Sequence, residues 1–344
     1  MRRWCFLVLW IACLSLIAVP AVRAAKSLEI YFIDVEGGQS TLVVDPEGES
    51  LLIDTGWDDF NGRDANRILA AAKEAGIDYI DDLVITHYHA DHAGGVAQLA
   101  SRIKIGAFFD HGPTREEDTR AIYETYEKIA TQAKHTILKP GDEIPFKGMR
   151  VQIVESAGVG ITKALAGAGQ PNSWCASEAK ALPDSSENAQ SVGMVITFGK
   201  FRFVDLGDLT NQKELALACP DNLIGTADLY LVTHHGTAHP GTGDSSNARA
   251  IVYALHPRVA VMNNGAIKGG HPVTWQTIHD SPGLEGFWQL HYSMAGAEDH
   301  NVPQQFIANV GGNDEGYAIK ASAEQDGVFT VTNERNGFSK TYSK

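Results

Sequence analysis

Residues 86–95, THYHADHAGG, place three histidines and an aspartate within six positions: His87, His89, Asp91 and His92. A hydrophobic core has no use for this pattern, whereas neutral imidazoles and carboxylates are ligands that zinc takes in proteins. The segment follows the β-rich run DDLVIT, so these side chains are expected on the chain leaving a strand. A short loop there can place His87 and His89 on one ion and Asp91 and His92 on a second. Two such ions can hold a hydroxide between them and stabilise the attacking and leaving oxygens.

A solvated, histidine-rich loop is the alternative, but four liganding side chains after a β-rich run, followed by two glycines, favour a metal site. The motif resembles the His-x-His-x-Asp-His signature of the metallo-β-lactamase fold superfamily. FIDVEGGQSTLVVDPEGESLLIDTG, ENAQSVGMVITFGKFRFVDLGDL, LVTHHG and NNGAIKGGHP add, in order, a similarity to the hydrolase domain of bacterial competence-type DNA-uptake channel proteins. This resemblance covers about residues 28–275. It implies an α/β fold of the αββα sandwich type, in which two mixed β-sheets carry helices on their outer faces.

The resemblance also implies which residues bind metal. It assigns His87 and His89 to a first metal ion, Asp91 and His92 to a second, and Asp208 of LGD to both ions as a bridging carboxylate. Asp208 fits this role because it ends an apolar strand and has two oxygens with which to span two cations. It also precedes a predicted helix, so a helix N-cap is the alternative role.

The last metal ligand is expected in THHG, where either His234 or His235 could serve. Side chains alternate along a strand, so one of the two is expected to point into the site. We favour His235 as the ligand and keep His234 as a neighbouring or substrate contact. His271 of GGHP also matches the subgroup and is predicted to line the pocket, although an ordinary surface histidine is the alternative. The predicted catalytic residues are therefore Asp91, Asp208 and His271.

Asn188 of SENAQS marks a departure from the wider superfamily, many members of which place a further histidine on the first metal at this point. Asparagine is not among the usual zinc ligands. The sequence resembles the competence-type subgroup in this respect, and the change disfavours a true β-lactamase and leaves the first site with a weaker ligand set. We expect two zinc ions as cofactors, with manganese or iron as alternatives.

Residues 1–24 are predicted to be a secretory signal peptide, because Arg2 and Arg3 precede an apolar run from Trp4 to Val19 and then PAVRAA. The apolar run is shorter than a membrane span usually needs, and no later stretch is apolar enough to cross a bilayer. The mature protein is therefore expected to be secreted or periplasmic. An uncleaved N-terminal anchor is the alternative.

The charge of the chain limits the class of partner. Residues 1–24 contain three arginines and no acidic residue, so their removal changes the formal net charge from −14 to −17. Such a protein repels polyanions and lacks the basic surface of an extended nucleic-acid site. We expect a small-molecule or polymer-end substrate, and a small phosphodiester remains compatible with the charge.

Strand and helix patterns alternate through both halves of the sequence. Segments 28–35, 39–45 and 50–56 predict strands separated by turn residues, and segment 63–76 has helical spacing and ends in glycine. Each half offers a sheet that needs cover on both faces, so two sheets packed together with helices outside is the expected arrangement. We predict one hydrolase domain over residues 25–344 that ends in a hairpin-like tail.

A long insertion and a cysteine pair interrupt this pattern. Residues 156–190 are rich in Gly, Ala, Ser and Pro, and loops of this length inside a compact domain are often functional. The insertion could border the substrate site, with a poorly ordered surface excursion as the alternative. Cys175 and Cys219 remain after signal removal and could form one disulfide in an oxidising compartment, which two cysteines alone do not prove.

These observations predict an exported zinc-dependent hydrolase that cleaves a phosphodiester or related phosphate ester with a metal-activated hydroxide. Asp91 would orient the hydroxide or accept its proton. An acyl hydrolase of the same fold, acting on β-lactams, lactones or thioesters, is the first alternative. A non-enzymatic metal-binding protein of the cell envelope is the second, and metal-dependent turnover would separate it from the enzymes.

Overall fold

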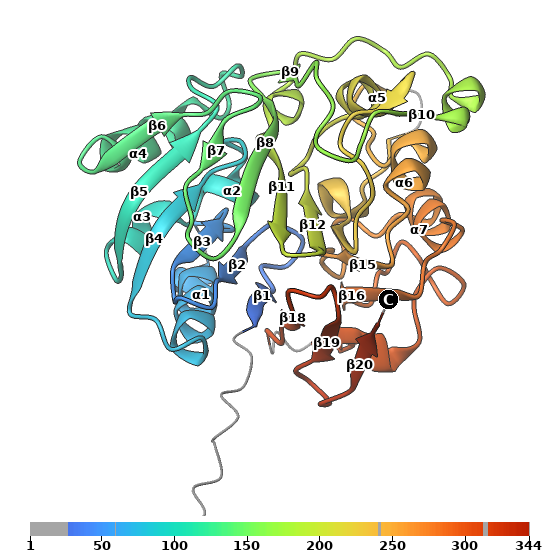
Figure 1. Cartoon of the computed structure of the whole chain (residues 1–344). Helices are drawn as coiled ribbons and strands as arrows, with labels where there is room; N and C mark the ends of the chain where they lie inside the picture. The colour runs from blue at the N-terminus through green and yellow to red at the C-terminus, as the bar shows by residue number, and fades with distance from the viewer. Residues whose placement is uncertain (1–26, 59, 240–241, 312–315, 344) are drawn as a thin grey trace, which may run out of the picture.

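The computed structural model describes residues 27–58, 60–239, 242–311 and 316–343 (Figure 1). The predicted signal peptide, residues 1–24, lies outside the described residues. Within these described ranges, no helix is long and apolar enough to cross a membrane. Two large mixed β-sheets pack face to face and carry helices on their outer faces, so the predicted αββα sandwich is confirmed.

The first sheet has the strand order β20-β19-β18-β1-β2-β3-β4-β5-β6. Its strands from β3 to β6 run parallel to one another, whereas β20 to β3 form an antiparallel series. The C-terminal hairpin therefore extends the sheet beside β1. The strands are β1 (Leu28–Phe32), β2 (Thr41–Val44), β3 (Ser50–Ile53), β4 (Tyr79–Val84), β5 (Lys104–Asp110), β6 (Lys134–Ile137), β18 (Ile319–Ala323), β19 (Phe329–Asn333) and β20 (Ser339–Tyr342).

The second sheet has the order β17-β16-β15-β14-β12-β11-β8-β7, with β9 paired to β8. Its parallel part runs from β12 to β17. A small separate pair joins β10 (Gln170–Pro171) to β13 (Asp221–Asn222). The strands of the second sheet are β7 (Glu143–Ile144), β8 (Arg150–Ser156), β9 (Val159–Gly160), β11 (Gly193–Phe198), β12 (Phe201–Asp205), β14 (Leu229–Leu231), β15 (Val259–Met262), β16 (Gly286–His291) and β17 (Ile307–Asn309).

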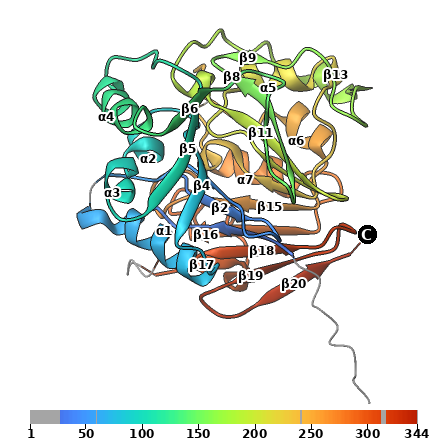
Figure 2. The ribbon, with the colours of Figure 1, turned by 60° about the vertical axis from the view of Figure 1, so that its left-hand side comes forward.

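Helices cover the outer face of each sheet (Figure 2). On the first sheet lie α1 (Arg63–Glu74), α2 (Ala90–Ala93), α3 (Val96–Ala100) and α4 (Arg120–Ala130), and on the second lie α5 (Asn211–Ala218), α6 (Arg249–Leu255) and α7 (Pro272–His279). The predicted helix over 63–76 is present as α1, after which Gly76 has a φ of 76°. Short 3-10 turns are η1 (Phe60–Gly62), η2 (Ser173–Ser177), η3 (Asn188–Gln190), η4 (Thr233–Gly236) and η5 (Gln304–Phe306).

The largest hydrophobic cluster lies between the two sheets. Alternate residues of β1 show how it is built, because Ile30 and Phe32 face the other sheet whereas Tyr31 faces the helices. The ring of Phe32 meets that of Phe203 on β12 at a centroid distance of 5.7 Å. Both faces of these strands are buried, which explains why they are apolar over nearly every residue instead of alternating.

Glu155 on β8 makes the stability of this fold depend on pH. Its side chain is fully buried, neither carboxyl oxygen has a partner among the described residues, and burial, only partly opposed by Lys213, raises its pKa to about 8. The folded protein therefore retains a proton that the unfolded chain releases near pH 4.5, so this stabilisation is present at low pH and is lost as pH rises toward 8.

Glu155→Gln is expected to remove this dependence. The variant should match the wild type at pH 4.5 and exceed its free energy of unfolding at pH 8.5 by up to about 5 kcal/mol, as a shift of that size implies. Urea unfolding at the two pH values measures the difference. The exposed Glu124→Gln on α4 serves as the control, and parallel pH profiles of wild type and Glu155→Gln would contradict the prediction.

Candidate metal centre

The predicted metal ligands meet at the edge where parallel strands of both sheets end. β4 leads to His87, β12 leads to Asp208, and β14 leads to His234 and His235. β12 and β14 are parallel neighbours, so their carboxyl ends share one edge of the second sheet. Polar side chains that follow such strands converge on one site, which is where open α/β sheets bind ligands.

His87 and His89 form the first half of the centre. Nε2 of His87 lies 3.0 Å from Nδ1 of His89. The other nitrogen of each ring has an acceptor beside it. Glu116 Oε2 lies 3.3 Å from His89 Nε2. Thr86 Oγ1 lies 3.1 Å from His87 Nδ1, and because its own proton goes to a carboxylate, it accepts from this nitrogen. Burial, together with the neighbouring histidines, holds the pKa of His87 well below its usual value. Two unprotonated nitrogens therefore face each other, as two ligands of one cation do.

Asp91, His92, Asp208 and His235 form the second half. One ligand atom from each of these four buried residues lies within 4.8 Å of all the others. His235 Nε2 is 3.2 Å from Asp91 Oδ2 and 3.3 Å from Asp208 Oδ2, and His92 Nε2 is 3.2 Å from Asp208 Oδ2. The structure thus brings together the residues predicted for the second ion.

Asp54, at the end of β3, orients this cluster. Its Oδ2 lies 2.7 Å from His92 Nδ1, and its carboxylate also accepts from the backbone N–H and the hydroxyl of Thr86. His92 Nδ1 therefore donates to Asp54, and its Nε2 faces the oxygens of Asp91 and Asp208. A carboxylate that orients the far nitrogen of a histidine is a common support for a metal ligand.

The charges of the second cluster call for a cation. Burial by itself would lower the pKa of His92, but Asp208, Asp91 and Asp54 raise it well above its usual value. Asp208 Oδ1 and His235 Nδ1 are buried without a hydrogen-bond partner among the described residues. The carboxylates thus favour positive charge at this position, and divalent cations ligated by imidazole and carboxylate fit the site.

Both histidines of THHG lie beside Asp208, which differs from the alternation that the sequence predicts. His234 Nε2 and His235 Nε2 lie 3.4 Å and 3.3 Å from Asp208 Oδ2. The two residues follow the end of β14 in the turn η4, and each has a φ of 54°, so the side-chain alternation of a strand no longer applies to them. His235 alone also contacts Asp91, whereas Nδ1 of His234 faces the hydroxyl of Ser246 at 3.3 Å.

Asn188 and His271 are held in other ways. The Asn188 amide donates to Asp244 Oδ1 at 2.8 Å, and its own Oδ1 is buried without a partner in the described chain. Nδ1 of His271 lies 2.8 Å from the carbonyl oxygen of Ala238. In the part of the chain that the structure describes, the hydrogen bonds of His271 go to that backbone and not to a ligand residue. Its catalytic role stays a prediction.

Three residues of the centre were missed by the sequence analysis: Asp54, Glu116 and Lys268. The ammonium group of Lys268 contacts Asp91 Oδ2 and lies 5.2 Å from the ring centre of Trp57. IDTG contained a signal for Asp54, because this acid follows an apolar strand in the same way as Asp208. β3 is also the parallel neighbour of β4, which leads to the histidine motif. Glu116 and Lys268 lie in loops whose path the sequence did not reveal.

Asp54→Asn is expected to weaken metal binding by about 10- to 100-fold, the usual cost of losing the residue that orients a metal-bound histidine. Competition with a chromogenic chelator measures the affinity. Asp45→Asn provides a matched control, because Asp45 is a buried aspartate after β2 that accepts from the backbone N–H of Glu47 and Glu49. Equal affinities in the two variants would show that Asp54 does not orient a ligand.

Comparisons with known proteins found one family model and several solved structures that resemble parts of this chain. Residues 33–159 match the model of the family described as the metallo-beta-lactamase superfamily. The metallo-beta-lactamase fold protein YhfI from Bacillus subtilis is 14% identical with a TM-score of 0.48, and the match covers 76% of this chain and 95% of that one. A diphosphatase from the PhnP family is 15% identical with a TM-score of 0.41, covering 75% and 94%. CmlA, a diiron β-hydroxylase from Streptomyces venezuelae, is 15% identical with a TM-score of 0.41, covering 75% and 47%.

The narrower similarity to competence-type proteins stays a prediction.

Proposed function

Because this chain has the metallo-β-lactamase fold and its residues 33–159 match that superfamily, we propose that it is an exported metal-dependent hydrolase of phosphodiesters or related phosphate esters. The observation that supports this most directly is the position of Asp208. Its Oδ2 lies within 3.4 Å of Nε2 of His92, His234 and His235, and 4.0 Å from Nε2 of His87. A carboxylate in reach of both ligand clusters can serve two cations.

The proposed cofactors are two zinc ions, with manganese or iron as alternatives, because imidazole and carboxylate ligands suit all three metals. When bound, such ions lower the pKa of water and stabilise charge on the reacting oxygens. Burial would raise the pKa of Asp91, but Lys268 and His92 hold it well below its usual value. The carboxylate is therefore ionised and can accept a hydrogen bond from an attacking water molecule.

Lys268 supports an anionic substrate. Its ammonium group stands beside buried Asp91, in a protein whose formal net charge is −14. With Asp91 holding a metal ion, Lys268 would be free to donate to a substrate oxygen, and the non-bridging oxygens of a phosphate ester are strong acceptors. The acidic composition restricts the proposal to small or polymer-end substrates rather than long nucleic acids.

The disulfide between Cys175 and Cys219 supports the proposed export. Disulfides form and persist in oxidising compartments and are rare in reducing ones. The bond therefore agrees with the N-terminal sequence, which resembles a signal peptide.

The proposed activity is tested by assaying zinc-loaded protein, residues 25–344, on bis(p-nitrophenyl) phosphate beside a chromogenic cephalosporin. Turnover of the diester that is absent from His89→Ala and intact in His279→Ala is expected, since His279 is an exposed histidine on α7. Turnover of the cephalosporin alone would replace the proposal with acyl hydrolysis. A zinc-bound protein that is inactive on both substrates would contradict it.

A further inference from the structure

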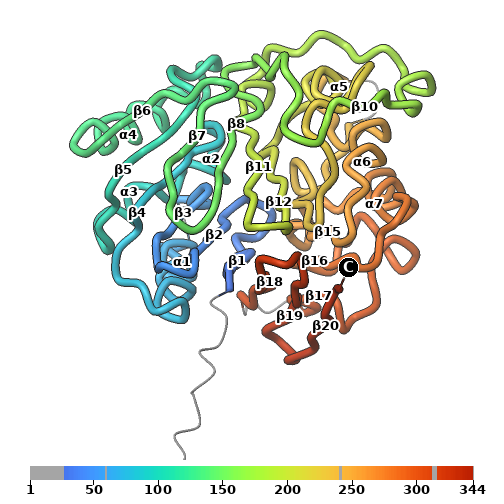
Figure 3. The backbone as a smooth tube through the Cα atoms, in the orientation of Figure 1, coloured from blue at the N-terminus to red at the C-terminus, as the bar shows by residue number. Residues whose placement is uncertain are grey.

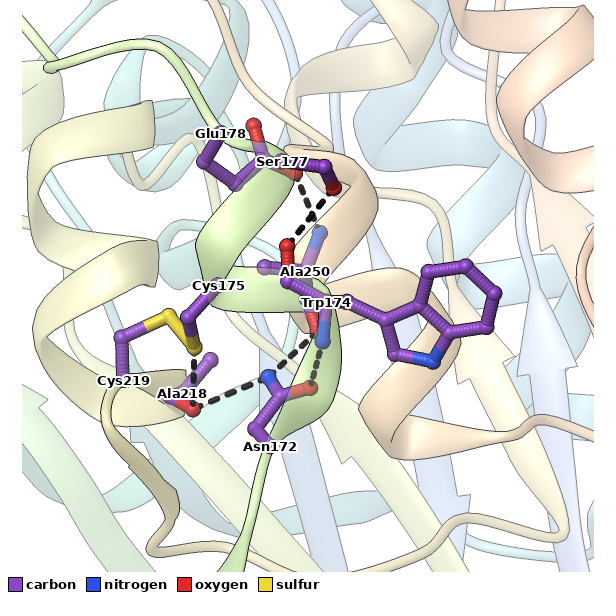
Figure 4. Close-up of a disulfide and its surroundings, with 8 residues drawn as sticks. All are labelled: Asn172, Trp174, Cys175, Ser177, Glu178, Ala218, Cys219 and Ala250. Carbon is purple, nitrogen blue, oxygen red and sulfur yellow. Dashed lines mark hydrogen bonds between the residues drawn. A yellow bond between two sulfur atoms is a disulfide. The ribbon is translucent and has the colours of Figure 1, made fainter.

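The insertion after β8 is fastened to the second sheet's helices. Figure 3 shows it running from β8 across to α5 and α6. Its strand β10 pairs with β13, and the disulfide joins Cys175 of η2 to Cys219 at the end of α5 (Figure 4). Asn172 donates to the carbonyl oxygens of Ala218 and Ala250, and Glu178 accepts from the N–H of Ala250. These contacts fix residues 170–178 of the insertion against α5 and α6.

The next residues of the insertion line a cavity of about 390 Å³. Residues 178–182 form one side, and the segment leading into α6, together with α7, forms the other. Cavities of this size hold small ligands.

The cavity adjoins the metal centre. Ser246 lines it and places its hydroxyl 3.3 Å from Nδ1 of His234. In the same segment, Asp244 accepts from the side-chain amide of Asn188, which lies in η3 before β11. The cavity therefore lies one side chain away from His234 of the metal centre.

The lining identifies the chemistry of a ligand. Lys180 and Arg249 bring two positive charges, whereas the carboxylate of Glu178 is already hydrogen-bonded to the backbone of α6. Hydroxyl and amide side chains supply most of the remaining polar groups. Cations beside hydroxyl and amide groups fit a group that is both phosphorylated and hydroxylated.

We propose that this cavity binds a phosphorylated sugar or polyol, as one half of the substrate that is cleaved at the metal centre. The inference rests on the proposed function, because it makes the substrate a phosphodiester of a sugar or polyol. The negative charge would lie near Lys180 and Arg249, and the hydroxyls near the hydroxyl and amide side chains of the lining. The attraction is expected to weaken with salt, since both cations are exposed to solvent.

Ribose 5-phosphate, titrated calorimetrically into zinc-loaded protein, tests the proposal. Lys180→Glu is expected to raise the dissociation constant about tenfold or more, as loss of one charge-assisted hydrogen bond implies. Ala181→Trp, which fills the cavity, should raise it at least as much. Lys163→Glu makes the same change of charge in the same insertion, outside the cavity lining, and should leave binding unchanged.

Turnover of bis(p-nitrophenyl) phosphate, which carries no sugar, should be unchanged in Lys163→Glu. Ribose 5-phosphate binding that is absent from the wild type, or equal in the wild type, Lys180→Glu and Ala181→Trp, would overturn the inference. Binding that depends on Lys180 in a protein that does not hydrolyse the diester would keep the cavity and reject the proposed function. Hydrolysis of the diester without Lys180-dependent binding of ribose 5-phosphate would keep the proposed function and reject the cavity as its binding site.

Discussion

His235→Ala is expected to lose one of two bound metal ions and to lower kcat/KM for a phosphodiester by about 1,000-fold or more. The side chain is fully buried, and its Nε2 contacts both Asp91 and Asp208, a pair of contacts that neighbouring His234 does not make. Metal ions contribute several kcal/mol of transition-state stabilisation, and each 1.4 kcal/mol is a factor of ten in rate. Metal analysis after dialysis and steady-state kinetics give the two readouts.

His234→Ala is the matched control, since it changes the adjacent histidine of the same turn. His234 contacts Asp208 but has no recorded contact with Asp91 among the described residues, so its loss is expected to cost about 10- to 100-fold in activity and to retain both ions. Burial lowers the pKa of His234 to about 4, so it is neutral at the pH of the assay. The reverse result, with metal lost from His234→Ala and kept by His235→Ala, would exchange the roles of the two residues.

The fold was largely predictable because its strands and helices carry strong local patterns. β1, β2 and β3 are apolar and bounded by turn residues, and α1 has an apolar stripe that ends before Gly76. By contrast, β16, β17 and α7 were missed, since their short segments follow long stretches without regular periodicity. The C-terminal hairpin was visible in the sequence, but its pairing with β1 was not, because pairing between strands almost 300 residues apart leaves no local signal.

The metal centre was predictable to the extent that its residues lie close together in the sequence. HYHADH gives four predicted ligands in one short segment, at the start of α2, whereas Asp208 and the histidine pair were assigned by resemblance and then found beside it. The sequence could not show that both His234 and His235 face Asp208, because positive φ values in a turn follow from packing and not from residue pattern. Gly269 shows how closely this turn is packed, because a Cβ at that position would lie only 2.2 Å from the carbonyl oxygen of His235. The ion pair of Lys268 with Asp91 joins residues 177 positions apart, beyond any motif.

Removal of the disulfide is expected to cause the second large effect. Cys175 and Cys219 close a loop over a sequence separation of 44 residues, and chain-entropy arguments give about 4 kcal/mol for a loop of this length. The double variant Cys175→Ser/Cys219→Ser should lose about that much free energy of unfolding in urea at neutral pH. A reducing agent should lower the stability of the wild type by a similar amount and leave the variant unchanged, which separates loss of the bond from effects of the serine side chains.

The disulfide also connects stability to the proposed binding cavity. Lys180 follows η2 by only three residues, and η2 is held to α5 by the bond, so the freed insertion should position its cation less well. The double variant is therefore expected to bind ribose 5-phosphate more weakly while its hydrolysis of bis(p-nitrophenyl) phosphate stays unchanged, because no metal ligand lies in the insertion between β9 and Glu178. Unchanged stability in the variant would contradict the entropic argument. Lower stability with unchanged sugar phosphate binding would mean that the hydrogen bonds of Asn172 and Glu178 keep the insertion in place without the disulfide.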